Sequence, residues 1–474
     1  MRKTIVVVGG GLGGIAAALR LARAGHAVEV WEKNAAPGGK LQERREAGFR
    51  WDLGPSLLTM PHVVRDLFEA AGEKLEDHLQ LDPLPLACRY AWRDGTTIDE
   101  DAAFWKRPDA ARFLAHAKGI YDLSGEAYLN YPPAEFWRAF TLRNLARLRH
   151  LPKVATLRTL AQEDARRFAD PHLRQIFDRF ATYNGSSPYR TPATFAIIPY
   201  VEATFGGWYV RGGMARLGEA AARLAERVGV VFRCGTEAKA WEHGVLESAD
   251  GRKARPDIVV CNQDVLAAAP TWLAPRYSKR RLAALLRPEL STSGFVLLLG
   301  TTRKFPRLAH HNIFFSDDYP AEFADLFDRK RLPADPTLYV AATCRTDPAD
   351  APPGGDNLFV LANAPAVPPG SLSDRDIAAY ADHVVARLEA AGLEGLSGAV
   401  AARHAFSPRE FAARDGSRHG ALYGWASHSL RASLLRPPLW RGRDLYFVGG
   451  TTHPGGGIPL VLLSAKMVAE RIGS

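Results

Sequence analysis

The sequence has few cysteines, and they form no pattern. Cys88, Cys234, Cys261 and Cys344 are scattered along 474 residues, and no two of them make a CxxC pair. This scatter excludes zinc-ligand spacing and a disulfide framework. It favours a protein that stays in a reducing cytoplasm.

Long apolar runs are also missing. No stretch approaches the 18 or so consecutive apolar residues of a membrane-spanning helix. The short run 4–8 follows Arg2 and Lys3, but glycines come at once, so it predicts a buried strand rather than a signal peptide. The chain has no low-complexity tract, no G-x-S-x-G elbow and no P-loop, which argues against a hydrolase or a kinase.

The composition is ordinary, but the charge is not. Hydrophobic residues make up 47% and charged residues 24% of the chain, as in folded soluble proteins, and the length suggests two or three subdomains. The net charge is +10, which suits a nucleic acid, an anionic lipid surface or no partner at all. Because no nucleic-acid-binding motif is present, we expect no nucleic acid partner.

The N-terminus carries a dinucleotide-binding pattern. A β-branched run ends at Val8, and G-x-G-x-x-G follows on Gly9, Gly11 and Gly14. A helix is expected from about Leu12 to Ala24, and the next strand, 27–31, ends at Glu32. A lone glycine fingerprint is weak, but the strand and helix around it make a nucleotide site the favoured interpretation.

Each part of this pattern has a physical task. Gly9 permits a tight turn, Gly11 lets the backbone approach a pyrophosphate, and Gly14 allows close helix packing. The helix N-terminus offers free N–H groups to phosphates, and Glu32 accepts hydrogen bonds from ribose hydroxyls. An acid at this position disfavours NADP. We also predict that Leu12, Gly13 and Lys33 contact the cofactor.

Two further motifs resemble the flavoprotein family that includes amine oxidases and carotenoid desaturases. They are Pro37-Gly38-Gly39-Lys40 and Leu53-Gly54-Pro55-Ser56. The resemblance implies FAD, with the paired glycines along it, Lys40 near its phosphates or ring, and the Leu-Gly-Pro turn beside the ring. Lys40 stands where that family more often has arginine, so it supplies charge but no bidentate fork.

The middle of the chain carries weaker matches. The stretch 206–214 resembles a desaturase segment that precedes a helix to Arg227 and a strand from Val228 to Arg233. Ala238 stands where relatives place a valine against the adenine. The stretch 309–316 is similar to hydroxycarotenoid 3,4-desaturases. Its His310 and His311 suggest a metal, but no acidic partner stands at ligand spacing, so we expect no metal site.

The C-terminus resembles bacterial carotenoid desaturases most specifically. A buried strand near residues 445–448 leads into Gly449 and Gly450, and amine oxidases have an acid where Gly450 stands. Then come Gly456, Gly457, Ile458 and Pro459, which open a helix to about Ile472. The helix N-terminus would stabilise negative charge on a reduced flavin. No catalytic residue is evident; His453 is a weak candidate, and a structural role for it is the favoured interpretation.

A membrane-facing segment is also expected. Residues 134–167 combine apolar side chains at helical spacing, such as Trp137 and Phe140, with interleaved arginines. Such a helix suits a membrane interface, and the alternative is an ordinary surface helix. We therefore predict a cytoplasmic protein peripherally associated with the inner face of the cell membrane.

The resemblance runs from residue 5 to residue 472. It implies an α/β fold: a Rossmann-like FAD-binding domain of the amine oxidase/phytoene desaturase type, with an inserted α+β substrate domain. The expected FAD-binding segments are 1–80, 206–275 and 426–474. The segments 81–205 and 276–425 are expected to form a helical, membrane-facing region and the substrate domain.

The implied activity is FAD-dependent desaturation of a carotenoid or other long apolar isoprenoid by hydride transfer. Oxygen or a quinone would be the electron acceptor, since no second glycine fingerprint for NAD is present. Two alternatives stay open. One is a retinol saturase-like or amine oxidase-like enzyme of the same fold, and the other is a non-enzymatic isoprenoid-binding protein.

Overall fold

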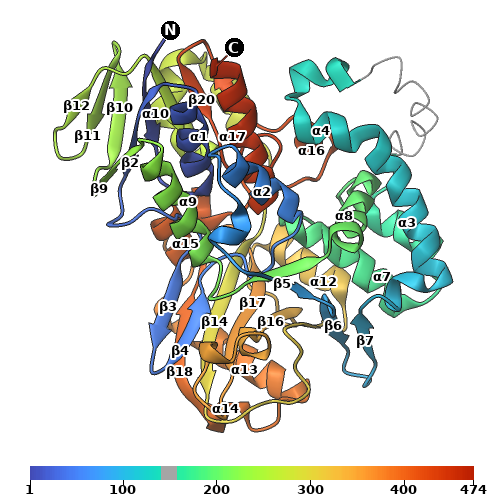
Figure 1. Cartoon of the computed structure of the whole chain (residues 1–474). Coiled ribbons are helices and arrows are strands. Elements are labelled where there is room, and N and C mark those ends of the chain that lie inside the picture. The colour runs from blue at the N-terminus through green and yellow to red at the C-terminus, as the bar shows by residue number, and fades with distance from the viewer. Residues whose placement is uncertain (140–156, 474) are drawn as a thin grey trace.

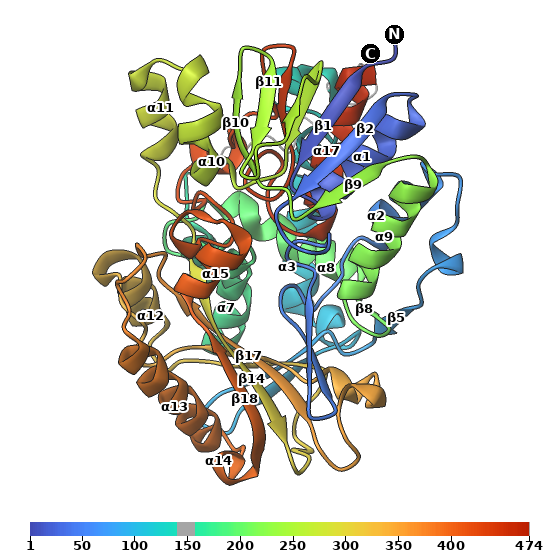
Figure 2. The same ribbon diagram turned by 90° about the vertical axis from the view of Figure 1, so that its left-hand side faces the viewer.

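A computed structural model describes residues 1–139 and 157–473 of the chain. Two sheets form its frame, one of six strands and one of seven (Figure 1). Helices cover both sheets, and a separate group of helices lies beside one edge of the larger sheet. In Figure 2 the six-stranded sheet lies above the seven-stranded sheet.

The six-stranded sheet holds the predicted nucleotide-binding strands. Its strands, in spatial order, are β19 (Trp440–Arg441), β20 (Leu445–Phe447), β13 (Ile258–Cys261), β1 (Thr4–Val8), β2 (Ala27–Glu32) and β9 (Val231–Cys234). All neighbours pair in parallel except β19 and β20. The strands come from three distant parts of the chain. The domain boundaries expected from the sequence stay a prediction.

Both faces of this sheet are covered, as buried parallel strands require. Helices α1 (Leu12–Arg23), α9 (Ala215–Arg227) and α17 (Ile458–Gly473) share a hydrophobic core with one face. The opposite face packs on α10 (Val265–Trp272) and on the small sheet of β10 (Ala238–Glu242), β11 (Val245–Ser248) and β12 (Lys253–Ala254). Since Val6 and Val7 lie on opposite faces and are both buried, β1 has no polar alternation.

The second sheet is mostly antiparallel. Its order is β18 (Val400–Phe406), β14 (Ser293–Thr301), β17 (Asn357–Ala364), β16 (Leu338–Ala341), β15 (His311–Phe314), β6 (Cys88–Ala91) and β7 (Thr97–Glu100). Leu297 and Leu299 pack with α13 (Asp374–Ala390), while Val296 and Leu298 pack with Phe49 on the other face. Alternate side chains of β14 therefore belong to two separate hydrophobic cores, one shared with α13 and one shared with Phe49.

The remaining elements connect and flank these sheets. The pairs β3 (Glu43–Glu46) with β4 (Phe49–Asp52) and β5 (Leu81–Leu84) with β8 (Gly207–Val210) are antiparallel. The other helices are α2 (Pro61–Glu69), α3 (Pro108–Ile120), α4 (Glu126–Asn130), α6 (Leu160–Arg167), α7 (Pro171–Asp178), α8 (Ile197–Phe205), α11 (Lys279–Leu286), α12 (Tyr319–Ala324), α14 (Leu396–Ala399), α15 (Pro408–Asp415) and α16 (Leu430–Leu434).

Some predicted elements differ from the observed ones. The strand expected from Val228 starts at Val231, because α9 ends there in a turn with Gly229 at φ +97°. Half of the expected membrane-facing segment, residues 140–156, lies outside the described residues. Within the described part of that segment, 133–139 form a short 3₁₀ helix and 160–167 form α6. No helix in residues 1–139 and 157–473 is long and apolar enough to cross a membrane.

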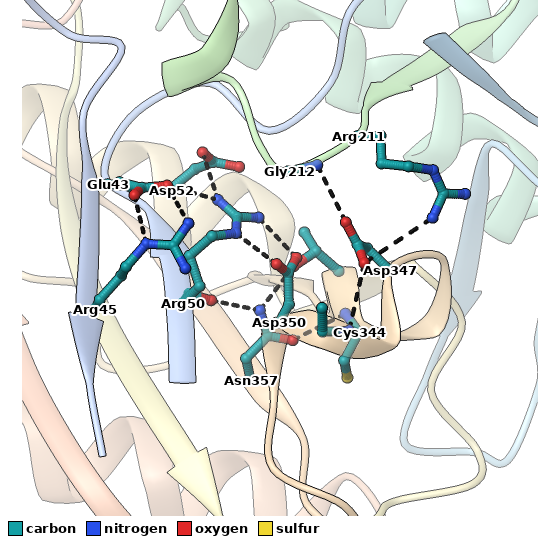
Figure 3. Close-up of polar contacts among 12 residues, drawn as sticks. Glu43, Arg45, Arg50, Asp52, Arg211, Gly212, Cys344, Asp347, Asp350 and Asn357 are labelled. Atoms are coloured by element: carbon teal, nitrogen blue, oxygen red, sulfur yellow. Dashed lines mark hydrogen bonds and ion pairs between the residues drawn. The ribbon is translucent and has the colours of Figure 1, made fainter. Parts of the chain in front are cut away.

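A buried ionic network joins the two halves of the molecule (Figure 3). Arg50 on β4 is 2% exposed, and its Nε and Nη2 donate to the two oxygens of Asp350 at 2.5 and 2.7 Å. Its Nη1 donates to Asp52, and its main-chain carbonyl accepts from Asn357 at the start of β17. The network therefore fixes the β3–β4 hairpin against the seven-stranded sheet.

Candidate cofactor and substrate site

One cavity of about 1020 Å³ extends between the two sheets. Nearly all the predicted cofactor residues line it. These are Gly9, Gly11, Leu12, Gly13, Glu32, Lys33, Gly38, Gly39, Lys40, Leu53, Gly54, Pro55, Ser56, Ala238, Gly449, Gly450, Gly456, Gly457, Ile458 and Pro459. The fold thus brings together motifs that are far apart in the sequence.

Gly14 and His453 are the two predicted residues that do not line the cavity. A Cβ on Gly14 would lie 2.1 Å from the carbonyl oxygen of Gly9, so this glycine permits the helix to pack on the strand. His453 is fully buried, and its Nε2 hydrogen-bonds with the carbonyl of Tyr131 at 2.9 Å. Its ring packs against Tyr128 and Phe136, which favours a structural role over a catalytic one.

Glu32 lies at the centre of the predicted nucleotide end of the cavity. This carboxylate is 4% exposed and accepts a hydrogen bond from Gly10 N at 2.7 Å and another from Asn34 N at 2.8 Å. Its position at the end of β2 suits a ribose, as in other dinucleotide folds. No side chain caps the N-terminus of α1, so its N–H groups remain available for a pyrophosphate.

Close backbone contacts explain the paired glycines. A Cβ on Gly39 would lie 2.8 Å from the Cα of Gly11, and one on Gly54 would lie 2.2 Å from the carbonyl oxygen of Lys40. Side chains at these positions would separate the segments that wall the cavity. The free helix N-terminus, the carboxylate at its ribose end and the glycine walls together fit FAD.

The predicted flavin end is built by three segments. They are the Lys40 region, the Leu53–Ser56 turn and the glycine loop before α17. Lys40 Nζ donates to the carbonyl of Leu422 at 3.0 Å. Gly457 has φ +105° and directly precedes α17, which directs the N-terminus of that helix toward the cavity. The helix dipole would favour negative charge there.

Sequence reasoning missed several polar residues of this site, among them Asn262 and Arg436. Asn262 follows β13, and its Nδ2 donates to the carbonyl of Gly9 at 3.4 Å. Arg436 is 5% exposed, lines the cavity and donates to the carbonyl of Tyr423 at 2.9 Å. A signal for Asn262 existed, because ligands of parallel sheets bind at the carboxyl ends of the strands. No motif in the sequence marked Arg436.

The adjacent histidines do not form a metal site in the structure. His310 Nδ1 hydrogen-bonds with Thr346 Oγ1 at 2.6 Å, and His311 Nδ1 with the Tyr339 hydroxyl at 2.8 Å. Across the described ranges, no three His, Cys, Asp or Glu side chains gather at metal-binding distances. Burial lowers the pKa of His310 to about 4, and it holds the pKa of His311 well below the usual range.

Replacing His310 by asparagine should change the pH dependence of stability. Because the folded-state pKa is about 4 and the unfolded one about 6.5, His310 destabilises the fold as pH falls from 6.5 to 4. Asparagine keeps a partner for Thr346 but does not titrate. At pH 7 the variant should have a lower free energy of unfolding than the wild-type protein. This difference should be smaller by about 2 kcal/mol at pH 4.5. Urea unfolding of both proteins at the two pH values measures this, and a constant difference would contradict it.

Comparison with known proteins places the chain in a family. The family model of the flavin-containing amine oxidoreductases matches residues 12–473 of this chain. The 1-hydroxycarotenoid 3,4-desaturase of Flavobacterium sp. (strain P99-3) is 35% identical over 99% of each chain. The 4,4'-diapolycopene oxygenase of Methylomonas sp. is 36% identical over 99% of this chain and 97% of its own.

Solved structures agree with this placement. Cyclohexylamine oxidase from Brevibacterium oxydans IH-35A superposes with a TM-score of 0.63 at 16% identity, over 100% of this chain and 99% of the other. The similarity confirms the predicted fold class, and the family confirms the predicted flavin cofactor. The chain belongs to the flavin-containing amine oxidoreductases and is an FAD-dependent oxidoreductase.

Proposed function

We propose that this enzyme desaturates a carotenoid or a carotenoid precursor. The observation that carries the proposal is the apolar wall of the cavity beyond the flavin segments. Its aliphatic and aromatic side chains come from α4, α8, the short 3₁₀ helix before α8 and the seven-stranded sheet, and include Leu129, Phe195, Ile197, Ile198, Val201, Ile313, Phe359 and Leu361. Such a wall suits a long hydrocarbon. The names of the two relatives support the same substrate class.

The chain contributes orientation rather than acid–base chemistry in this proposal. Bound FAD supplies the hydride acceptor. The apolar wall excludes water and holds one C–C bond of the polyene beside the Leu53–Ser56 turn. Delocalisation along the polyene stabilises the positive charge left by hydride loss, so a strong general base is unnecessary. The burial of His453 away from the cavity agrees with this division of roles.

Peripheral contact with a membrane is part of the proposal, because the substrate resides in lipid. Trp137, Leu157 and Leu435 are large apolar side chains with exposures of 71%, 94% and 51%. Leu434, the neighbour of Leu435, lines the cavity. The net charge of +10 suits the anionic inner face of a cell membrane. We propose oxygen or a quinone as the final electron acceptor.

Pigment analysis after co-expression tests the function. The chain is expressed with enzymes that make phytoene or, separately, a hydroxylated carotenoid, and the extracts are separated and their absorption recorded. A red-shifted polyene is expected, since each new double bond lengthens the conjugation. A shift from phytoene identifies a phytoene desaturase, and a shift only with the hydroxylated carotenoid identifies a 3,4-desaturase. Unchanged pigments in both strains, with FAD bound, would reject the carotenoid substrate and favour a saturase or an oxidase.

A further inference from the structure

The apolar part of the cavity contains one group of polar side chains. We call it the polar pocket and define it by Cys88, Arg179, Tyr183, Glu202, His311 and Tyr339, all of which line the cavity. Arg179 begins a short 3₁₀ helix after α7, and Glu202 lies on α8. Their exposures are 7% and 4%, so both charges are removed from water. Nothing in the proposed hydride transfer uses them.

The charges of the polar pocket are only partly paired within the protein. Arg179 Nη2 donates to the Tyr90 hydroxyl at 2.8 Å, and that hydroxyl donates to Glu100. Tyr183 donates to Glu202 Oε2. Arg179 Nε, however, has no hydrogen-bond partner in the described part of the chain. This nitrogen is itself closed to solvent, so any contact of Arg179 with a molecule in the cavity is made by other atoms of its side chain, which lines the cavity.

Glu202 in the pocket and Glu100 behind it are close enough to interact. Burial and the neighbouring Glu202 raise the pKa of Glu100 well above its usual range. The raised pKa favours the protonated form of Glu100, beside Arg179 and Glu202. A site with one acceptor and one donor facing a cavity can bind a neutral hydroxyl from both sides.

The polar pocket also lies next to the predicted flavin position. Ser56, which ends the Leu53–Ser56 turn, shares a hydrogen bond with the Tyr339 hydroxyl, and Tyr339 shares another with His311. Arg179 lies close enough to His311 and Tyr339 to influence the pKa of each. A polar atom held in the pocket would therefore lie only a few bonds from the carbon atoms that react.

We propose that the polar pocket binds an oxygen atom near one end of the substrate, such as a terminal hydroxyl. Glu202 accepts the hydroxyl hydrogen, and Arg179 donates to its oxygen. The inference rests on the proposed desaturation and deepens it, because it sets which bond reacts. A hydrocarbon end without oxygen would cover Arg179 and Glu202 without adding a hydrogen bond to either, so it should bind less well.

The test uses two acyclic polyenes that differ only in one terminal hydroxyl. Their Kd values for the FAD-loaded protein and their kcat/KM values are measured, and each preference is expressed as a ratio. The wild-type protein should favour the hydroxylated polyene by about tenfold or more in both ratios. In Glu202→Met the preference should fall to about twofold or less, and Glu202→Gln, which keeps an acceptor oxygen, should give an intermediate value.

A matched control comes from Glu322→Gln. Glu322 is as buried as Glu202, at 2% exposure, but it hydrogen-bonds with Ser316 and Thr337 and does not line the cavity. Its replacement should leave the preference unchanged. Flavin content and the unfolding temperature report whether each variant folds. If Glu202→Met does not fold, the ratio in Glu202→Gln decides.

The outcomes separate the inference from the proposed function. Equal turnover of both polyenes by the wild-type protein, or an unchanged preference in the Glu202 variants, overturns the inference and leaves desaturation intact. Preferential binding that depends on Glu202, with no turnover of either polyene, supports the polar pocket and rejects the desaturase. Tighter binding and faster turnover of the hydroxylated polyene, both lost in Glu202→Met, support both.

Discussion

Replacing Arg50 by methionine should lower the free energy of unfolding by about 3–5 kcal/mol. Arg50 is buried between Asp350 and Asp52, and it also donates to the Tyr209 hydroxyl (Figure 3). Methionine fills part of the space but leaves two carboxyl groups in a region without water. Burial already raises the pKa of Asp52, and loss of the guanidinium would raise it further. Urea unfolding followed by circular dichroism measures the change.

Arg45→Met is the matched control for this prediction. Arg45 lies on the same hairpin and contacts Glu43 at 2.6 Å, but its side chain is 55% exposed. Its loss should change stability by no more than about 0.5 kcal/mol. The double variant Arg50→Met with Asp350→Leu should be more stable than Arg50→Met alone, since it removes one of the two unpaired charges. A change below about 1 kcal/mol in Arg50→Met would mean that water reaches the network.

Replacing Glu32 by glutamine should weaken FAD binding by about 10–100-fold. Hydrogen bonds to a charged group are worth about 1.5–3 kcal/mol, and the ribose hydroxyls would lose a charged acceptor. Glutamine keeps one acceptor oxygen, for Gly10 N, but its amide nitrogen takes the place of the oxygen that accepts from Asn34 N, so part of the loss comes from this local contact. Titration of the apoprotein with FAD, followed by flavin fluorescence, gives the Kd of each protein.

Glu29→Gln controls for a general effect on strand β2. Glu29 lies on the same strand, but its side chain is directed to Arg233, at 3.1 Å, and it does not line the cavity. Its replacement should leave the Kd for FAD unchanged. Wild-type affinity in Glu32→Gln would contradict the ribose contact and would leave the helix N-terminus as the main determinant of binding.

The parts of the fold that depend on local patterns were predictable. The strand before Gly9, the helix at 12–23 and the acidic end of β2 are local features, because glycine and hydrophobic periodicity fix them within about 30 residues. The same holds for the glycine loop before α17. The cofactor and the joining of three distant segments into one domain were predicted from the resemblance to a family. Hydrophobic periodicity alone predicts neither.

The polar pocket and the Arg50 network were not predictable in this way. Arg179 and Glu202 meet only because α7 and α8 pack beside the seven-stranded sheet, and an arginine or glutamate in a helical stretch usually lies on the surface. Arg50 and Asp350 are 300 positions apart. Contacts between such distant residues depend on the whole topology, and no short motif records them.

The strands of the six-stranded sheet are synthesised at very different times, and this affects when FAD can bind. Strand β1 starts at Thr4 and β20 at Leu445, yet both belong to one sheet, and α17 covers α1 (Figure 1). At about 5–20 residues per second, roughly 20–90 s separate the synthesis of the two strands. During that time the Gly9–Gly14 turn and the side of α1 that packs on α17 lack their C-terminal partner. Newly made chains would therefore depend on chaperones, and FAD would be inserted only after translation ends.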